Sequence, residues 1–245
     1  MLRSHFPAVL SASLIAALAS CTNESKTVGA DASPPAESPV AFRATGNEPG
    51  WRLDIGRAEM VLLTNFGQER LVVATPKADA SGGTIRYVAR TKGGELVVAI
   101  TDRLCVDSMS GMPHPQTVEV VTGDRNLVGC GGEPVSLLQG AEWSVFEIDG
   151  APIVAGSQTT LGFAADGQLA GQASCNKLTG GYSLSGEGLA ISPGSGTPMT
   201  CDEAILAQER RFLAALGKVQ GFSITADGLL LLRTGDGGSI RARRP

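Results

Sequence analysis

The stretch GQASCNKLTGGY, residues 171–182, places Cys175 beside Asn176 among glycines and small polar residues. Residues of these types favour tight turns, because glycine tolerates positive φ angles and asparagine bonds to nearby backbone groups. A cysteine in such a setting is a nucleophile, a metal ligand or half of a disulfide. The choice among these three decides whether the chain is better interpreted as an enzyme or as a disulfide-braced β protein.

The first residues have the pattern of an export signal. Residues 1–20 begin with Arg3 and continue into a mostly apolar run that is too short to span a bilayer. The sequence LASC, residues 18–21, resembles the lipobox of bacterial lipoproteins, in which the cysteine is acylated and becomes the mature N-terminus. Thr22 stands where an aspartate usually retains such proteins at the inner membrane. The resemblance implies a lipid on Cys21 and a periplasm-facing location at the outer membrane.

The segment 21–41 is predicted to be a flexible tether, since it is rich in serine, alanine and proline and nearly free of large apolar residues. The chain carries a formal net charge of −4, and its basic residues do not cluster before the closing RARRP, which we interpret as a solvated terminus. Nucleic-acid binding depends on neutralising phosphates with lysine and arginine. The expected partner surface is therefore the membrane, reached through Cys21, and not a nucleic acid.

Beyond the tether, glycine-containing turns separate short apolar runs, which is typical of antiparallel β proteins. We expect an N-terminal β-rich domain over 42–138 and a C-terminal domain over 139–245. Asp-Gly pairs, as at 149–150, favour the positive φ angles of hairpin turns. The predicted strands are 70–74, 84–90, 95–100, 116–121, 142–148, 159–163, 168–172, 181–184, 188–191, 219–224 and 229–233.

One segment departs from the strand pattern. In TCDEAILAQERRFLAALG, residues 200–217, the apolar side chains fall on one stripe of a helix. Asp202 is a candidate N-cap and Gly217 a candidate stop. The fold class predicted is thus mainly β, with two small antiparallel β-barrel or roll domains. The second carries one packed α-helix, at about 203–217, that covers an open end or a face.

Four cysteines remain besides Cys21, two in each half: Cys105, Cys130, Cys175 and Cys201. In an oxidising compartment such thiols form disulfides, and four allow three connectivities. We favour pairing within each half, because it closes loops of similar length and needs no contact between domains. A zinc site would need C-x-x-C pairs, which the sequence lacks, and a cysteine nucleophile would need a base, for which His114 between two prolines is a poor candidate. The sequence therefore predicts no catalytic residue, metal or cofactor.

The order of motifs after residue 143 resembles the META domain, the HslJ-like family of bacterial envelope proteins. It has a tryptophan opening a strand, a G-x-x-x-C-N run followed by Gly-Tyr, and a T-x-M-x-C run leading into a helix with an early glutamate. The residues that carry the resemblance, besides the cysteines, are Trp143, Gly171, Asn176, Tyr182, Thr197, Met199 and Glu209. It implies a small barrel-like fold with a packed helix, links to heat shock, antibiotic tolerance and motility, and no enzymatic activity.

The side chains of these motifs suit structural roles. We expect Asn176 to cap or bridge backbone groups at a turn. Trp143 and Tyr182 are expected to be core aromatics with a tethered polar tip. Glu209 is either a solvated flank of the helix or a buried partner of an arginine.

The first half contains GNEPGW (46–51), CVDSMSG (105–111) and GCGGEP (129–134), which resemble a poorly characterised domain of bacterial envelope lipoproteins. Gly50 stands where that domain is expected to have an aromatic residue. Asp107, Ser108 and Ser110 form its most functional-looking polar cluster, although a turn that satisfies backbone donors is the simpler interpretation. The motif residues of this half are Trp51, Asp107, Ser108 and Gly111.

The sequence thus favours an outer-membrane-anchored lipoprotein that binds a partner or supports the envelope under stress or antibiotic challenge. Its partner could be an envelope protein or a small molecule. One alternative is an inhibitor of a secreted protease or lysozyme. Another is a periplasmic hydrolase that uses the polar cluster at 107–110.

Overall fold

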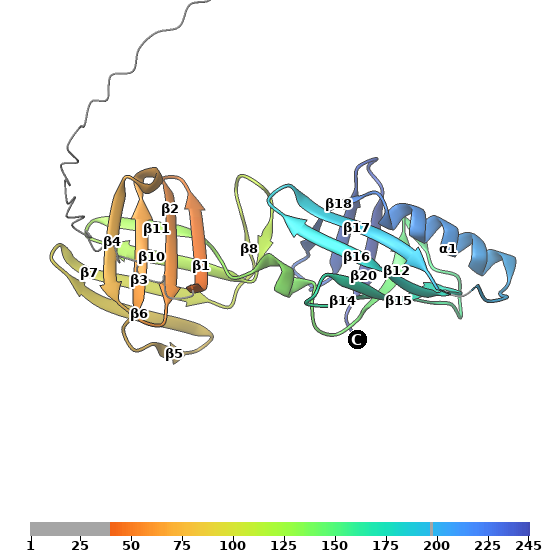
Figure 1. The fold of residues 1–245 in the computed structure, drawn as a ribbon, viewed down its shortest axis with the longest axis horizontal. Coiled ribbons are helices and arrows are strands. Elements are labelled where there is room, and N and C mark those ends of the chain that lie inside the picture. The colour runs from red at the N-terminus through yellow and green to blue at the C-terminus, as the bar shows by residue number, and fades with distance from the viewer. Residues whose placement is uncertain (1–39, 197) are drawn as a thin grey trace, which may run out of the picture. The chain divides into compact units, whose positions relative to one another are not determined.

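The structure, a computed structural model, describes residues 40–196 and 198–245. The predicted signal, Cys21, nearly all of the tether and Thr197 lie outside these residues. The described residues belong to one compact unit, which contains two large antiparallel sheets (Figure 1).

The N-terminal sheet has nine strands in the order β4-β3-β2-β1-β11-β10-β7-β6-β5 and curls into a half-barrel. Alternation builds its core: on β7, Leu96, Val98 and Ile100 are buried, and Val120 and Val118 lie opposite the last two on β10. The strands are β1 Val40–Asn47, β2 Gly50–Gly56, β3 Glu59–Thr64, β4 Glu69–Ala74, β5 Asp79–Ser81, β6 Thr84–Thr91, β7 Gly94–Thr101, β10 Gln116–Thr122 and β11 Arg125–Gly131. The 3₁₀ turn η1, Asn65–Gly67, joins β3 to β4.

The C-terminal sheet follows the order β17-β16-β15-β14-β12-β20-β19-β18, with β13 beside β12, and forms a nearly closed barrel. Its strands are β12 Trp143–Ile148, β13 Ala151–Pro152, β14 Gln158–Phe163, β15 Gln168–Ser174, β16 Lys177–Ser185, β17 Gly188–Ser195, β18 Val219–Ile224, β19 Leu230–Thr234 and β20 Ser239–Arg243. The 3₁₀ turn η2, Pro134–Leu137, precedes it. The two residues of the Asp149-Gly150 pair have φ of 51° and 77°, as a tight hairpin turn requires.

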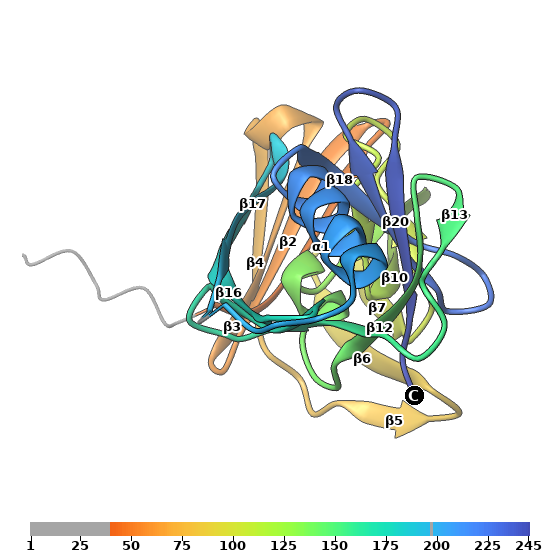
Figure 2. The same cartoon turned by 90° about the vertical axis from the view of Figure 1, so that its right-hand side faces the viewer.

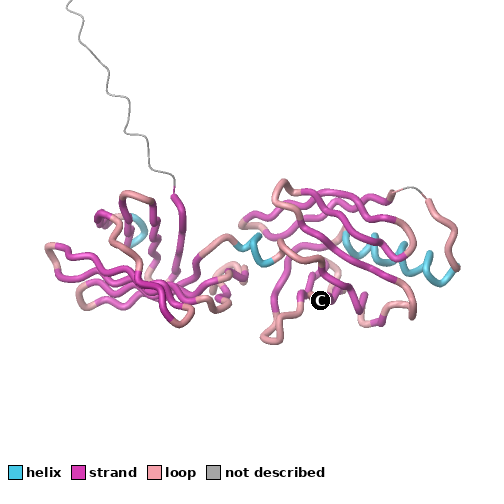
Figure 3. The backbone as a smooth tube through the Cα atoms, turned by 90° about the horizontal axis from the view of Figure 1, so that it is seen from below, coloured by secondary structure: helices cyan, strands magenta, loops and turns pink. Residues whose placement is uncertain are grey.

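The helix α1, Glu203–Leu216, is the one α-helix in the described part of the chain and the longest cyan segment in Figure 3, where the 3₁₀ turns are also cyan. Figure 2 shows it nearly end-on, and it packs against β12, β15, β17 and β20. Phe212, Ala215 and Leu216 bury its apolar stripe in the core of the C-terminal sheet. Asp202 occupies the N-cap position, but its side chain makes no capping hydrogen bond.

The predicted fold class is confirmed: the chain is mainly β, in two sheets, with one helix close to its expected bounds. Five full strands, namely β1, β2, β3, β11 and β20, were not among the predicted ones. The predicted disulfides are also confirmed, since Cys105 bonds Cys130 and Cys175 bonds Cys201. No helix among the described residues combines the length and apolar character needed to cross a bilayer.

Candidate functional site

A loop between two short strands forms the candidate site of the N-terminal half. Strand β8, Cys105–Val106, pairs with β9, Pro113–His114, and the Cys105–Cys130 disulfide ties the base of the loop to β11. We call residues 105–114 the disulfide loop.

Asp107 organises this loop from within. Its Oδ1 accepts hydrogen bonds from the Ser110 N–H (2.7 Å), the Ser110 hydroxyl (2.7 Å) and the Met109 N–H (3.1 Å). Its Oδ2 accepts one from the Asn47 amide at 2.8 Å, and Asn47 also donates to the Ser108 hydroxyl. The Gly111 N–H bonds the Asp107 carbonyl, and Gly111 has a positive φ of 70°. The carboxylate therefore fixes the path of the loop and joins it to β1.

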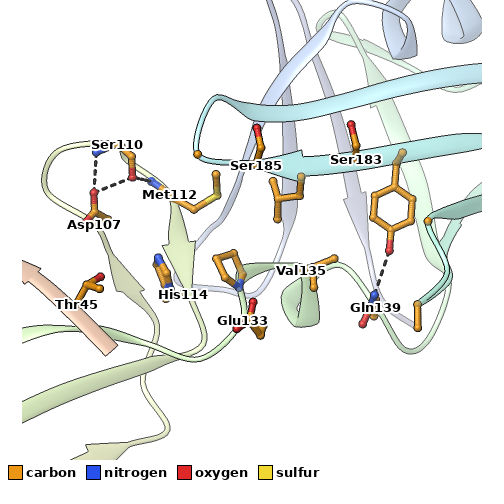
Figure 4. Close-up of a pocket in the computed structure, with 16 residues that line it drawn as sticks. Thr45, Asp107, Ser110, Met112, His114, Glu133, Val135, Gln139, Ser183 and Ser185 are labelled. Carbon is orange, nitrogen blue, oxygen red and sulfur yellow. Dashed lines mark hydrogen bonds between the residues drawn. The ribbon is translucent and has the colours of Figure 1, made fainter. Parts of the chain in front are cut away.

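These bonds shift the acidity of Asp107. Partial burial alone would raise its pKa, but the hydrogen bonds from Ser110, Asn47 and Met109 outweigh that effect and lower the pKa to about 2. A carboxylate of such low pKa is a weak proton acceptor near neutral pH. Figure 4 shows Ser110 turned toward Asp107, and the Ser110 hydroxyl also accepts the Met112 N–H at 3.2 Å. The arrangement fits a carboxylate that holds the loop in place better than one that activates the Ser110 hydroxyl as a nucleophile.

The disulfide loop presents apolar side chains to solvent although its polar groups are engaged. Met109 is 81% exposed and Val106 is 58% exposed. On its other side, Met112 packs against the core of the C-terminal sheet. The hydrogen bonds of Asp107 thus fix a loop whose Met109 and Val106 side chains remain open to solvent.

A cavity of about 680 Å³ adjoins the disulfide loop (Figure 4). The His114 ring reaches its wall, with Nδ1 3.0 Å from the Gly132 carbonyl oxygen. Tyr182 lines it too; its hydroxyl donates to the Ala164 carbonyl at 2.6 Å and accepts from the Gln139 amide at 3.1 Å. Exposed Glu133 adds one carboxylate. The cavity is thus lined by hydroxyl, imidazole and carboxylate groups together with the apolar side chains of Met112, Pro134, Val135 and Leu184.

An exposed aromatic side chain lies over the turn between β1 and β2. Phe66 is 81% exposed and has a left-handed backbone, with φ 55° and ψ 35°, between Asn65 and Gly67, which also have positive φ. Its ring lies over Gly50, where a Cβ would come within 2.7 Å of Phe66 Cε1. Phe66 therefore occupies the space in which an aromatic residue was expected from position 50.

Glu209 and Asn176 form a buried polar centre in the C-terminal half. Glu209 is 6% exposed; its Oε2 accepts the N–H groups of Cys175 (3.0 Å) and Asn176 (2.7 Å), and its Oε1 accepts the Asn176 amide at 2.6 Å. The Asn176 Oδ1 accepts the Met199 N–H at 2.6 Å. Asn176 thus bridges backbone groups at a turn, as expected. Both interpretations of Glu209 were wrong, because it is neither solvated nor paired with an arginine.

The neighbouring Gln208 was missed by the sequence analysis. Its Oε1 accepts the Val154 N–H at 2.6 Å, and its Nε2 donates to the hydroxyls of Ser157 and Ser174. Two adjacent polar residues on a helix otherwise suggest a solvated face. Only the position of β15 against α1 shows that both point inward.

The motif aromatics Trp143, Tyr182 and Trp51 have structural roles. Trp143 is buried and donates its indole N–H to the Leu138 carbonyl at 2.9 Å, while the Arg244 guanidinium lies 4.3 Å from its ring. The basic residues at 241–244 were interpreted as a solvated terminus, but Arg244 packs over the Trp143 ring. Tyr182 meets Phe163 edge to face, at 5.1 Å between centroids. Met199 is exposed, and the buried Trp51 packs against Gly46 and Gly129 so closely that neither position has room for a Cβ.

The fold and these centres define a disulfide-braced, mainly β protein in which Asp107, Asn176, Gln208 and Glu209 hold loops and turns. Among the described residues, His, Cys, Asp and Glu do not gather in threes as a metal site would require. The family model of the META domain matches residues 136–244, so the C-terminal half carries a META domain. The predicted resemblance of this half is confirmed.

Two solved structures are similar to part of the chain. One is an NMR structure of a protein from Burkholderia xenovorans, 23% identical, which covers 45% of this chain and 85% of its own, with a TM-score of 0.38. The other, also an NMR structure, is 18% identical and covers 44% of this chain and 92% of its own, with a TM-score of 0.36. No curated protein matches the chain.

Proposed function

We propose that this chain is an exported protein, anchored through a lipid on Cys21, that binds a partner in the cell envelope and catalyses no reaction. The disulfide loop and the adjoining cavity are its binding face. The observation that carries the proposal is the state of Asp107: its carboxylate is spent on holding the loop, and the exposed Met109 tip is what remains for a partner.

Three further features support it. Two disulfides fit an oxidising compartment. The sequence at 18–21 resembles a lipobox, and several acyl chains on one cysteine hold a protein stably at a membrane. The META domain is compatible with an envelope role, from which we propose support of the envelope under stress or antibiotic challenge.

Photocrosslinking in living cells tests the binding face. A photoreactive residue at position 109 of the full chain should give a defined adduct, and one at exposed Arg211 on α1 should not. Adding Asp107→Ala, which frees the loop, should weaken the adduct. Equal adducts from both positions, or none from 109, would contradict the proposal.

Detergent phase partitioning tests the anchor. Cys21→Ser should move the protein from the detergent phase to the aqueous phase.

A second candidate is an inhibitor of a secreted protease or lysozyme. The observation that favours it is the rigid, disulfide-braced loop with an 81% exposed Met109 at its tip. The soluble chain should then inhibit an added lysozyme or serine protease in proportion to its concentration, and Met109→Asp should abolish this. A hydrolase using the 107–110 cluster predicts instead an activity that Ser110→Ala removes.

A further inference from the structure

The free edge of β4 lacks the devices that protect other sheet edges in the described part of the chain. β4 ends the N-terminal sheet and pairs with β3 alone, in register over all six residues and without a bulge or proline. The opposite end strand, β5, has only three residues. At the ends of the C-terminal sheet, β17 contains Pro193 and β18 has a bulge between Val219 and Gly221. Short strands, prolines and bulges all hinder the addition of another strand, and β4 has none of them; its charged residues, Glu69 and Arg70, occupy only its first two positions.

A trough runs along this edge. It measures about 630 Å³ and is lined by residues 71–74 of β4 and by the tips of two hairpins, residues 90–93 and 122–125. Leu71 and Val73 are half-buried and pack against the core, while Val72 is 38% exposed. The trough therefore offers unpaired backbone groups beside an apolar floor, which is what an added strand needs.

The rim of the trough is mainly basic. Arg90 and Lys92 are exposed and form no ion pair with the described residues. Arg125 is neutralised by Glu69, at 2.7 Å, which leaves Asp124 as the opposing charge. Two free cations against one free anion favour an acidic occupant over a basic one.

We propose that the β4 edge binds an extended acidic peptide segment of a partner protein, which adds to the N-terminal sheet as a further antiparallel strand, in keeping with the antiparallel pairing of that sheet. Main-chain hydrogen bonds to β4 supply affinity. The apolar side chains of the peptide contact Leu71 and Val73. Its carboxylates approach Arg90 and Lys92. This surface is separate from the disulfide loop, so the proposal stands or falls independently of the proposed function.

The test uses the folded chain and a synthetic peptide of alternating glutamate and valine, equal in length to β4. Its binding, followed by NMR, should shift the β4 amide signals and slow their hydrogen exchange. Two matched peptides carry N-methyl groups on alternate residues. In one peptide the methyl groups block the N–H groups of one edge of the strand, and in the other peptide they block those of the opposite edge. One should bind like the parent and the other should fail, because an added strand pairs through one edge only. Binding by both, or no protection of β4 amides, would overturn the proposal.

Charge reversal supplies the second arm. Arg90→Glu with Lys92→Glu should weaken the acidic peptide roughly tenfold and favour its lysine-valine counterpart. The matched control is Arg211→Glu with Arg233→Glu, which changes exposed residues of the C-terminal half and should leave affinity unchanged. Equal effects of the two pairs, or β4 protection that arises from self-association of the chain without peptide, would refute an acidic peptide as the occupant.

Discussion

Glu209 on α1 accepts both the backbone N–H and the side-chain amide of Asn176, a residue that precedes it by 33 positions. With the N–H of Cys175, one buried carboxylate satisfies three donors. The same turn is tied by the Cys175–Cys201 disulfide to the segment that leads into α1. Cys175 thus ties the turn after β15 covalently to the segment before α1, and Asn176 ties the same turn to α1 by hydrogen bonds.

Replacing Glu209 by Gln should destabilise the protein strongly. The amide retains one oxygen and turns N–H donors toward the donors of Asn176, so buried groups lose partners, and we expect a loss of roughly 2–4 kcal/mol in the free energy of unfolding. Chemical denaturation measures it. Glu203→Gln, on the exposed first turn of the same helix, should cost under about 0.5 kcal/mol. Equal losses for the two variants would show that the centre is not buried and paired as described.

The carboxylate and the asparagine should act as a unit. Asn176→Ala alone is expected to cost about as much as Glu209→Gln, and the double variant should lose less than the sum of the two, because each removes the same bonds. Additive losses would contradict a shared centre.

Asp107 should make the stability of the N-terminal half depend on pH. Its pKa in the folded chain is about 2, below the ordinary value of 3.8, so its contribution is complete above about pH 4 and is lost as the pH falls toward 2. Because the group is partly exposed, we expect roughly 1 kcal/mol. The stability difference between the native chain and Asp107→Asn should be present at pH 6 and shrink at pH 2.5. A difference that grows on acidification would reverse the assignment.

Removing the Cys105–Cys130 bridge should loosen the disulfide loop. The bridge joins residues 25 apart, and its replacement by two alanines should cost roughly 3 kcal/mol, mainly by releasing the unfolded chain. Limited proteolysis should then cut near exposed Met109.

Thiol labelling checks both bridges in the chain without substitutions. When that chain is unfolded without reductant, a thiol reagent should label none of Cys105, Cys130, Cys175 and Cys201. Stoichiometric labelling would contradict the pairing.

Gly171 should tolerate no side chain. A Cβ there would overlap the carbonyl oxygen of Thr160 on the neighbouring β14, and the backbone φ is +153°. Gly171→Ala should therefore cost more than about 2 kcal/mol. The control is Gly186→Ala, whose Cβ would meet nothing within 4 Å. A neutral Gly171→Ala would show that β14 and β15 are further apart than described.

The predictions from sequence succeeded where a signal repeats over neighbouring residues. The alternation in 84–90 is reproduced by β6, and the apolar stripe after residue 202 by α1. They failed for β1 and β11, where Gly46 and Gly129 interrupt the pattern, and also for β2, β3 and β20. These glycines are present because Trp51 packs against their backbone, a contact between strands that no local pattern reveals.

The sequence by itself determined the β-rich class, the helix and the META resemblance, since periodicity, turn residues and motif order can be followed along the chain. Its four cysteines left three pairings open, and the structure selected Cys105–Cys130 and Cys175–Cys201. Only the tertiary structure decided that Asp107 holds a loop in place, that Glu209 binds Asn176, and that β4 ends a sheet with its edge uncovered. Each of these depends on which distant segments meet. The physical reason is that a carboxylate's role is set by the donors around it, and those donors come from residues far away along the chain.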